Sequence, residues 1–365
     1  MKIAIILGTR PEIIKMAPLI RLADKRPDLD YFILHTGQHY SHEMDQQFFD
    51  DLELPQPKYN LAVGGQPFRK QIGCMVKAIM QILNQEKPAV ALVQGDTVSV
   101  LAGALAANKL RIPIGHHEAG LRSHDLTMLE ETNRIVTDHI ADYLFAPTSD
   151  AYKNLIDEGL TDKKVVLSGN TVVDALNQHI KIAEKKANIL KKLNLASKEY
   201  LVATAHRAEN VDNKKRLSGI LNGLYLVARD FKLPIIYPVH PRTLKNIKNF
   251  NFKIPPGVKL IKPLGYFEFL QLEAHAKLIM TDSGGLQEEA CILKVPCVTL
   301  RDNTERPETV AAQINILAGA NPAKILAGAR KMMSADKVWV NPFGDGRAAE
   351  IILNSLNDKL NHKNI

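Results

Sequence analysis

The segment LIMTDSGGLQEEACILKVPCVTLRDNTERPE, residues 278–308, predicts a strand, a tight glycine turn, a helix, a second strand and a charged loop. The apolar run Leu278–Met280 forms the first strand, and the turn is Ser283–Gly285. Backbone N–H groups at a helix start are unpaired and attract negative charge, and glycine lets a phosphate approach them. An ordinary strand-to-helix turn is the alternative. The charged cluster Arg301–Arg306 favours a nucleotide site, because open α/β sheets bind ligands at the carboxyl ends of strands.

Short apolar runs alternate with helical patterns along the whole chain, which is typical of parallel strands buried on both faces. The strands predicted in the first half are Ile3–Leu7, Tyr31–His35, Ala89–Gln94, Ile114–His117, Tyr143–Ala146 and Val165–Leu167. Those predicted in the second half are Tyr200–Thr204, Ile235–Val239, Val258–Ile261, Leu278–Thr281 and Cys297–Leu300. The helices predicted between them include Pro11–Arg26, Pro67–Glu86 and Thr97–Lys109. We therefore expect an α/β protein with two doubly wound parallel sheets.

A chain of 365 residues exceeds the usual size of one hydrophobic core, so two domains are expected. We predict a Rossmann-like domain over residues 1–170 and a second over residues 171–346. A lysine-rich helical stretch, Thr171–Leu193, opens the second domain. A final helix within residues 347–365 is predicted to pack back on the first. If the two sheets face each other, the carboxyl ends of both sets of strands would lie around one central cleft.

The composition is ordinary for a soluble globular protein, with 45% hydrophobic and 24% charged residues. The net charge of +8 favours polyanionic ligands, phosphorylated small molecules among them. Much of the excess lies in Lys181–Lys198 and in the C-terminal tail. These segments lack the interleaved aromatic residues of a nucleic-acid platform, so nucleic-acid binding is not expected.

The cysteines Cys74, Cys291 and Cys297 are few, odd in number and set among apolar residues. This pattern predicts free thiols in a reducing compartment. The first residues, MKIAIILGTRPE, have too short an apolar run for a signal peptide. Since no apolar run approaches the roughly 18 residues that span a bilayer, we expect a cytoplasmic protein without membrane contact.

Charged residues cluster where the predicted strands of the first half end. Arg10 and Lys15 lie near the first helix start, where cations suit a diphosphate. Asp96 and Glu118 follow two further strands and could transfer protons. Asp96 could instead only cap the next helix.

A second acidic group, Glu130 and Glu131, precedes Arg134 by a helical turn. Separate carboxylates that converge on one cleft suit paired acid and base steps. The alternative is an ion pair between one of these glutamates and Arg134 along the helix, and we expect that one of them makes it.

In the second half, His206 and Arg207 follow the first strand, where a histidine can bind phosphate or assist a leaving group. Phe269 could cover a flat base, although a core phenylalanine is the simpler interpretation. The candidate acids and histidines at the strand ends, Asp96, Glu118, Glu130 and His206, are not joined by HxxxH or DxD spacing, and dinucleotide and P-loop glycine motifs are absent. We therefore expect no metal and no cofactor.

At these residues the chain resembles the non-hydrolysing UDP-N-acetylglucosamine 2-epimerase family over essentially its whole length. The resemblance rests on GTRPE at Gly8–Glu12, TGQH at Thr36–His39, QGDT at Gln94–Thr97, HHEAGLR at His116–Arg122, EETNR at Glu130–Arg134, AHRAEN at Ala205–Asn210, PVHP at Pro238–Pro241, TDSGGLQEE at Thr281–Glu289 and RDNTERPE at Arg301–Glu308. It implies a GT-B fold, usually as a homodimer. It also implies reversible conversion of UDP-GlcNAc to UDP-ManNAc by elimination and re-addition of UDP through 2-acetamidoglucal, supplying sugars for surface polysaccharide or glycan synthesis.

The resemblance also implies roles for individual residues. The implied acid/base group is Asp96, Glu118 and Glu130, with His206 at the diphosphate or leaving group. The implied substrate-binding residues are Arg10, Lys15, Arg134, Phe269, Ser283, Gly284, Gly285, Glu289 and Arg306, with Glu289 on the ribose and Phe269 beside the uracil. The residues implied for a second, activating UDP-GlcNAc site are Gln38, His39, Arg207 and His240.

Three positions depart from the family pattern: Leu129 replaces a proline, Ala208 replaces a cation, and Leu264 replaces a polar residue near the base. The change at Ala208 puts allosteric activation in doubt. A hydrolysing epimerase that releases ManNAc is one alternative. A GT-B glycosyltransferase and a non-catalytic UDP-sugar sensor are others, although neither needs three converging acids.

Overall fold

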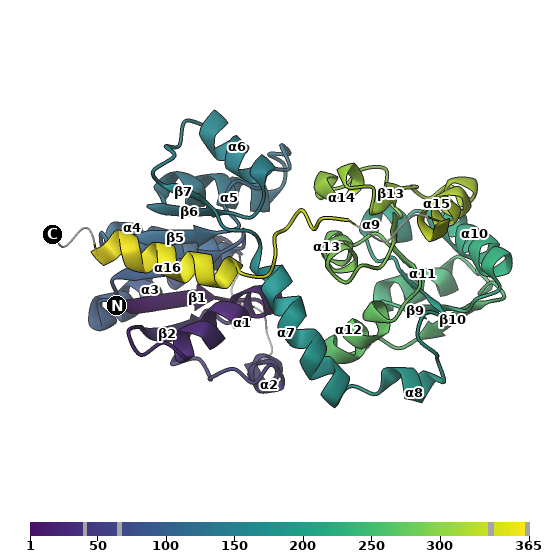
Figure 1. Ribbon diagram of the computed structural model, residues 1–365, viewed down its shortest axis with the longest axis horizontal. Helices are drawn as coiled ribbons and strands as arrows, with labels where there is room; N and C mark the ends of the chain where they lie inside the picture. The colour runs from purple at the N-terminus through teal and green to yellow at the C-terminus, as the bar shows by residue number, and fades with distance from the viewer. Residues whose placement is uncertain (39–41, 64–67, 335–338, 362–365) are drawn as a thin grey trace. The chain divides into compact units, whose positions relative to one another are not determined.

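The computed structural model describes residues 1–38, 42–63, 68–334 and 339–361. Its contacts divide the chain into unit 1, Met1–Asn177 with Phe343–Ile365, and unit 2, Gln178–Pro342 (Figure 1). The boundaries predicted from the sequence, between residues 170 and 171 and between residues 346 and 347, differ from these bounds by a few residues. The first boundary falls inside a helix that continues from one unit into the other, so no break in the sequence pattern marks it.

Unit 1 is built on a seven-stranded parallel sheet. Its strands are β1 (Lys2–Leu7), β2 (Asp30–His35), β3 (Tyr59–Asn60), β4 (Val90–Gln94), β5 (Ile114–His117), β6 (Tyr143–Ala146) and β7 (Val165–Leu167), in the order β3-β2-β1-β4-β5-β6-β7. Its helices are α1 (Arg10–Asp24), α2 (His42–Asp51), α3 (Phe68–Glu86), α4 (Val98–Lys109), α5 (Leu129–Ile140), α6 (Ser149–Asp157), the connecting α7 (Thr171–Lys186) and α16 (Ala348–Asn361). The strand order reverses between β1 and β4, which are neighbours in the sheet.

Unit 2 repeats this plan with six parallel strands. Its strands are β8 (Leu201–Thr204), β9 (Ile235–Pro238), β10 (Val258–Ile261), β11 (Ile279–Thr281), β12 (Cys297–Thr299) and β13 (Asn315–Leu317), in the order β10-β9-β8-β11-β12-β13. Its helices are α8 (Ile189–Leu193), α9 (Ala208–Val211), α10 (Lys214–Phe231), α11 (Pro241–Asn249), α12 (Tyr266–Ala274), α13 (Gly284–Ile292), α14 (Pro307–Ala311) and α15 (Pro322–Ser334). The expected α/β fold with two Rossmann-like sheets is therefore confirmed.

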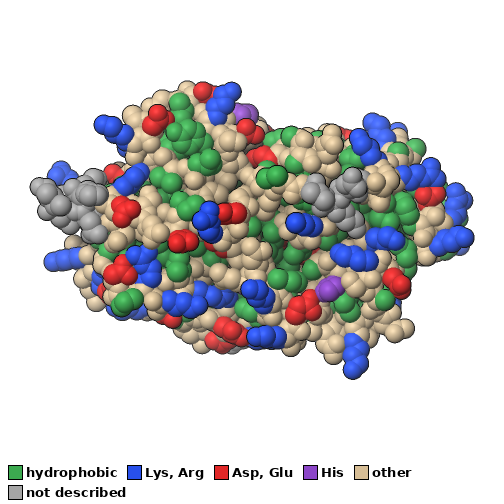
Figure 2. Space-filling view, viewed as in Figure 1, with side chains coloured by type: hydrophobic (Ala, Val, Ile, Leu, Met, Phe, Trp, Pro, Cys, Tyr) green, Lys and Arg blue, Asp and Glu red, His purple; other side chains and the backbone are tan. Residues whose placement is uncertain are grey.

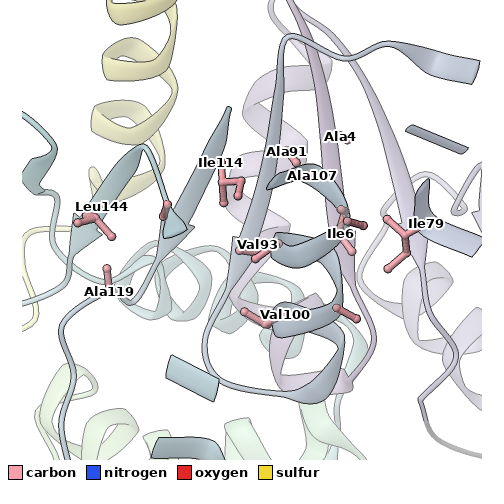
Figure 3. Packing of buried hydrophobic residues seen from close by; sticks show 14 of the residues in the cluster. Ala4, Ile6, Ile79, Ala91, Val93, Val100, Ala107, Ile114, Ala119 and Leu144 are labelled. Carbon is pink, nitrogen blue, oxygen red and sulfur yellow. The ribbon is translucent and has the colours of Figure 1, made fainter. Parts of the chain in front are cut away.

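The core of unit 1 explains why the sequences of its strands are continuous apolar runs. Figure 3 shows Ile6 of β1 and Val93 of β4 beside helical side chains such as Ile79 and Val100. All four residues are buried, because helices cover both faces of a parallel sheet. Burying each such side chain contributes roughly 1.5–3 kcal/mol.

The last helix, α16, packs against α1 of unit 1 and lies beside it in Figure 1. Asp174 fixes its start, since the carboxylate accepts hydrogen bonds from the backbone N–H of Ala348 (3.2 Å) and Ala349 (3.1 Å). An acidic acceptor at a helix start satisfies unpaired N–H groups and complements the helix dipole.

Acidic and basic side chains are interspersed on the face shown in Figure 2. None of the helices within the described residues has the length and apolar character required to cross a bilayer.

Candidate active site

The charged residues of unit 1 gather at the carboxyl ends of three neighbouring strands. Arg10 and Lys15 lie on α1 after β1, Asp96 follows β4, and Glu118 follows β5. Because β1, β4 and β5 are adjacent and parallel, these loops lie at one edge of the sheet. The Arg10 guanidinium lies 5.8 Å from the centre of the Phe48 ring.

Glu118 is a buried carboxylate, and the described residues that donate to it include a lysine, an asparagine and a glutamine. Lys15 Nζ lies 2.6 Å from its Oε1, Asn170 Nδ2 donates to the same oxygen at 2.9 Å, and Gln94 Nε2 donates to Oε2. The side chain is 6% exposed, and the backbone adopts φ +64°, which is uncommon for any residue except glycine. Such strained residues persist where surrounding contacts hold them, often at functional sites. Gln94 is the last residue of β4, and Asn170 directly precedes α7; neither was among the site residues predicted from the sequence.

Asp96 forms an ion pair and does not cap a helix. Thr97 caps α4 through its side chain, which accepts from the N–H of Val100, so the capping alternative for Asp96 is wrong. The Asp96 carboxylate pairs with the guanidinium of Arg134 and is 31% exposed. The carboxylate is therefore accessible and held in place by its cation.

The two adjacent glutamates of α5 have different environments. Glu131 is buried, lies 2.5 Å from Arg134, and accepts hydrogen bonds from the N–H groups of Ser123 and His124 at 2.9 Å each. Burial alone would raise its pKa, but these hydrogen bonds and Arg134 lower it below its usual range. Glu130 is exposed and makes no hydrogen bond or ion pair with any described residue. Glu131 is therefore the structural member of the pair, and Glu130 remains available as an acid or base.

Glu12 is a further buried acid of this cluster, to which the sequence analysis gave no role. Its carboxylate accepts from the N–H of Gly8 (2.5 Å) and Thr9 (3.0 Å) and from the hydroxyl of Thr97 (2.5 Å). Burial is the largest influence and raises its pKa to about 7 against these hydrogen bonds, with Asp96 raising it further. Glu12 thus connects the loops that follow β1 and β4.

We expect Glu12→Gln to change how stability depends on pH. The folded pKa of about 7 exceeds the ordinary 4.5, so the stabilisation from protonated Glu12 is complete below pH 4.5 and lost as pH rises through 7. Glutamine does not titrate, so the variant does not lose stability in this way. The free energy of unfolding of the variant, relative to that of the unmodified protein, should therefore rise by up to about 3 kcal/mol between pH 4.5 and 8. Thermal unfolding at both pH values measures this shift as several degrees. Glu350→Gln makes the same change at an exposed position and is the control, so a parallel trend in both variants would contradict the assignment.

Unit 2 contains a cavity of about 250 Å³ at the carboxyl ends of its central strands. Its lining residues are Thr204, Ala205, His206, Pro238, His240, Pro263, Leu264, Phe269, Ser283 and Leu286. Phe269, Leu264 and Leu286 make it apolar on one side, while His206, His240 and Ser283 carry polar groups. This combination suits a flat base attached to a polar or charged group.

A buried aspartate, Asp282, positions His206. Asp282 Oδ1 lies 3.1 Å from His206 Nδ1, and the carboxylate also accepts from the backbone N–H of His206 and Arg207 and from Asn210 Nδ2. Burial raises its pKa, but the bonds from His206 and Asn210 prevail and lower it. Asp282 therefore remains a carboxylate that orients the imidazole. Asp282 was not among the site residues predicted from the sequence.

The glycine turn after β11 leads directly into α13. The Ser283 hydroxyl caps this helix by accepting from the N–H of Leu286 at 3.5 Å. Neither Gly284 nor Gly285 has positive φ, and a Cβ at either would make no contact closer than 3.4 Å. Packing within the chain therefore does not require glycine at either position.

The two glutamates of α13 also differ. Glu288 is buried and lies 2.5 Å from Arg306 Nε, so it is occupied with that cation, whereas Glu289 is half-buried. Among the residues implied for a second site, Gln38 accepts from the hydroxyl of Ser99 at 2.7 Å, and His240 caps α11. His39 lies outside the described residues. The described residues contain no group of three or more acids, histidines or cysteines placed to hold a metal ion.

The two units thus carry complementary chemistry. Unit 1 presents an accessible Asp96, the buried Glu118 and an exposed Glu130 among cations. Unit 2 presents the helix start of α13, capped by Ser283, and an apolar cavity that Ser283 also lines. Two Rossmann-like sheets with these features define an enzyme of the GT-B type that acts on a nucleotide sugar.

The chain belongs to the UDP-N-acetylglucosamine 2-epimerase family, whose model matches residues 21–357. It is 52% identical over 362 residues to the UDP-N-acetylglucosamine 2-epimerase of Methanocaldococcus jannaschii, covering 98% of this chain and 99% of the relative. The crystal structure of a M. jannaschii UDP-GlcNAc 2-epimerase in complex with UDP-GlcNAc and UDP aligns with a TM-score of 0.85 over 98% of this chain and 100% of that one. The UDP-2,3-diacetamido-2,3-dideoxy-D-glucuronate 2-epimerase of Pseudomonas aeruginosa is 40% identical over 333 residues, covering 90% of this chain and 92% of the relative.

Proposed function

We propose that this epimerase converts UDP-GlcNAc to UDP-ManNAc reversibly and without net hydrolysis. The observation that carries the proposal is the acid/base group of unit 1, in which Asp96 and Glu118 pair with cations while Glu130 is exposed. The 52% identity to an enzyme named for UDP-GlcNAc supports this substrate over that of the 40% identical relative. We further propose that the protein acts as a homodimer and supplies ManNAc-type sugars for glycan synthesis.

The proposed route is elimination followed by re-addition. A carboxylate removes the proton from carbon 2, a carbon 1–carbon 2 double bond forms, and the carbon 1–oxygen bond breaks, leaving the electron pair on UDP. UDP then adds back to carbon 1 of 2-acetamidoglucal, and an acid returns the proton to the opposite face of carbon 2. Atoms and charge balance without an oxidant. The route needs a base and an acid at carbon 2, and it needs UDP to stay tightly bound.

The residues divide by role. The proposed acid/base residues are Asp96, Glu118 and Glu130. The proposed UDP contacts are His206 at the diphosphate, Ser283, Gly284 and Gly285 at phosphate, Glu289 at the ribose and Phe269 at the uracil. The cations Arg10, Lys15, Arg134 and Arg306 neutralise phosphates or orient the acids. The last role has support in the Lys15–Glu118 and Arg134–Asp96 pairs. Gln38, His39, Arg207 and His240 are proposed for an activating second site.

Proton NMR of the purified protein with UDP-GlcNAc in deuterated water tests the function. We expect UDP-ManNAc to accumulate and both epimers to carry deuterium at carbon 2, because the abstracted proton exchanges with solvent. A heat-inactivated sample serves as the control. Free ManNAc with UDP would identify a hydrolysing enzyme, and UDP-ManNAc without deuterium would contradict proton exchange at carbon 2. Parallel incubation with UDP-2,3-diacetamido-2,3-dideoxy-D-glucuronate tests the alternative substrate.

A further inference from the structure

His116 lies on β5, and both nitrogens of its buried ring face hydrogen-bond acceptors. Nδ1 lies 2.7 Å from Oδ1 of Asp138, and Nε2 lies 2.8 Å from the carbonyl oxygen of Gly95. A neutral imidazole has a single N–H donor, so the ring satisfies both acceptors only when both nitrogens carry hydrogen. His116 thus joins the backbone of the loop after β4 to a side chain of α5.

Asp138 is the acceptor that fixes the ring at Nδ1. The carboxylate is buried, and its Oδ2 accepts from the backbone N–H of Gly120 at 3.1 Å and lies 2.8 Å from Arg122 Nη1. Burial would raise the pKa of Asp138, but His116 and Arg122 lower it below its usual range. Asp138 therefore remains a carboxylate, which accepts from His116 and cannot donate to it.

The hydrogen bonds of His116 and Asp138 connect the segments that carry the proposed acid/base residues. These segments are the loop of Gly95 with Asp96, the loop of Gly120 with Glu118, and the helix of Asp138 with Glu130. Proton transfer depends on the relative positions of these acids. One buried pair therefore holds the three segments in register.

Asp96 has the most direct connection to His116. The carbonyl before Asp96 accepts from His116, and the carbonyl of Asp96 itself accepts from Asn133 Nδ2 at 2.9 Å. Gly95 has φ +85°, and glycine has more backbone freedom than any other residue. Because the chain at Gly95 does not by itself restrict the direction of Asp96, the hydrogen bonds to the two flanking carbonyls have to define it.

The neighbouring histidine and arginine have other partners. His117 points to the opposite face of the sheet, where its Nε2 accepts from the N–H of Thr171 at 3.4 Å. Burial lowers the pKa of His117 to about 4, so this ring is neutral at neutral pH. Arg122 lies 2.6 Å from Glu158 in addition to its contact with Asp138.

We propose that His116 is a positioning residue of the acid/base group, which holds the peptide before Asp96 against Asp138 and so directs the Asp96 carboxylate towards carbon 2 of the sugar. This inference rests on the proposed function, in which Asp96 is one of the acids that act at carbon 2. His116 is buried, so it acts through the Gly95 carbonyl and not by touching the substrate.

Two replacements of His116 separate its two hydrogen bonds. The amide nitrogen of glutamine can take the place of Nε2 and donate to Gly95, whereas that of asparagine can take the place of Nδ1 and donate to Asp138. We expect His116→Gln to keep kcat for UDP-GlcNAc within about fivefold of the unmodified protein. His116→Asn should lower kcat about 10²-fold, which is the cost of misplacing a reacting group by about 1 Å. The Kd of UDP should stay within about twofold in both variants, because neither change alters a proposed UDP contact.

The matched controls are His139→Gln and His139→Asn, which make the same changes at an exposed position next to Asp138 on α5. Both should leave kcat unchanged. A loss in His116→Gln as large as that in His116→Asn, or an unchanged kcat in His116→Asn, overturns the role of His116 and leaves the proposed function intact. Failure of the unmodified protein to form UDP-ManNAc contradicts the proposed function itself, and the role of His116 with it.

NMR of the unmodified protein with ¹⁵N-labelled histidine tests the two donors without any replacement. We expect at least one histidine to show two slowly exchanging ring N–H signals at the pH of the assay. If no histidine shows two such signals, the proposal is overturned whatever the variants do. Thermal unfolding checks that the variants fold, and the NMR result decides should His116→Asn not fold.

Discussion

Replacing Asp96 by asparagine is expected to lower kcat by about 10³-fold or more while the Kd of UDP stays within about tenfold. Asparagine preserves the size of the side chain but cannot take or give the proton that epimerisation requires. Arg134 keeps a carbonyl oxygen to bind, and Thr97 still caps α4. Steady-state NMR assays and calorimetry measure the two quantities separately.

The matched control is Asp150→Asn, which makes the same chemical change at an exposed first-turn position of α6. It should leave kcat and the Kd of UDP unchanged. If Asp96→Asn retained most of its activity, Asp96 would only position Arg134, and Glu118 or Glu130 would carry the chemistry. Thermal unfolding of both variants checks that they fold. Loss of folding in Asp96→Asn alone would instead indicate that the Asp96–Arg134 ion pair is structural.

Much of the fold follows from the sequence because buried parallel strands read as continuous apolar runs. The runs at Ile114–His117 and Val258–Ile261 coincide with β5 and β10. The two strands that were not predicted, β3 and β13, have two and three residues and lie at sheet edges. Such short edge strands bury little apolar surface, so their formation depends on the neighbouring strand. The prediction of a single lysine-rich helical stretch over Thr171–Leu193 was also wrong in detail. The helix α7 ends at Lys186, and a separate helix, α8, begins at Ile189.

The candidate site was predictable in location but not in the state of each residue. Strand ends identify Asp96 and Glu118, yet only the structure shows that Thr97 is the cap. Adjacent residues on a helix point about 100° apart, so sequence alone predicts that Glu130 and Glu131 differ without saying which faces inward. Asp282 was overlooked because a buried aspartate beside a serine and two glycines carries no separate sequence signal.

Replacing Gly285 by alanine is expected to stabilise unit 2 slightly and to raise the Kd of UDP at least about tenfold. The two effects have opposite signs because they have different causes. Gly285 is exposed and lacks positive φ. The atom nearest to a Cβ added at this position would be Ser283 Oγ, at 3.9 Å, so alanine fits without strain. Alanine in a helix is typically more stable than glycine by about 0.5–1 kcal/mol.

The expected loss of UDP affinity follows from the position of the new methyl group of alanine at residue 285. The first N–H groups of α13 have no intrahelical partners, and a phosphate that accepts from them must approach the backbone where the new Cβ projects. Gly73→Ala makes the same change within α3, where a Cβ meets nothing within 4 Å, so it should raise stability without altering the Kd of UDP. Thermal unfolding and calorimetry on both variants give the comparison. Unchanged UDP affinity in Gly285→Ala would move the phosphate away from this helix start, whereas lower stability would mean that the glycine serves the fold after all.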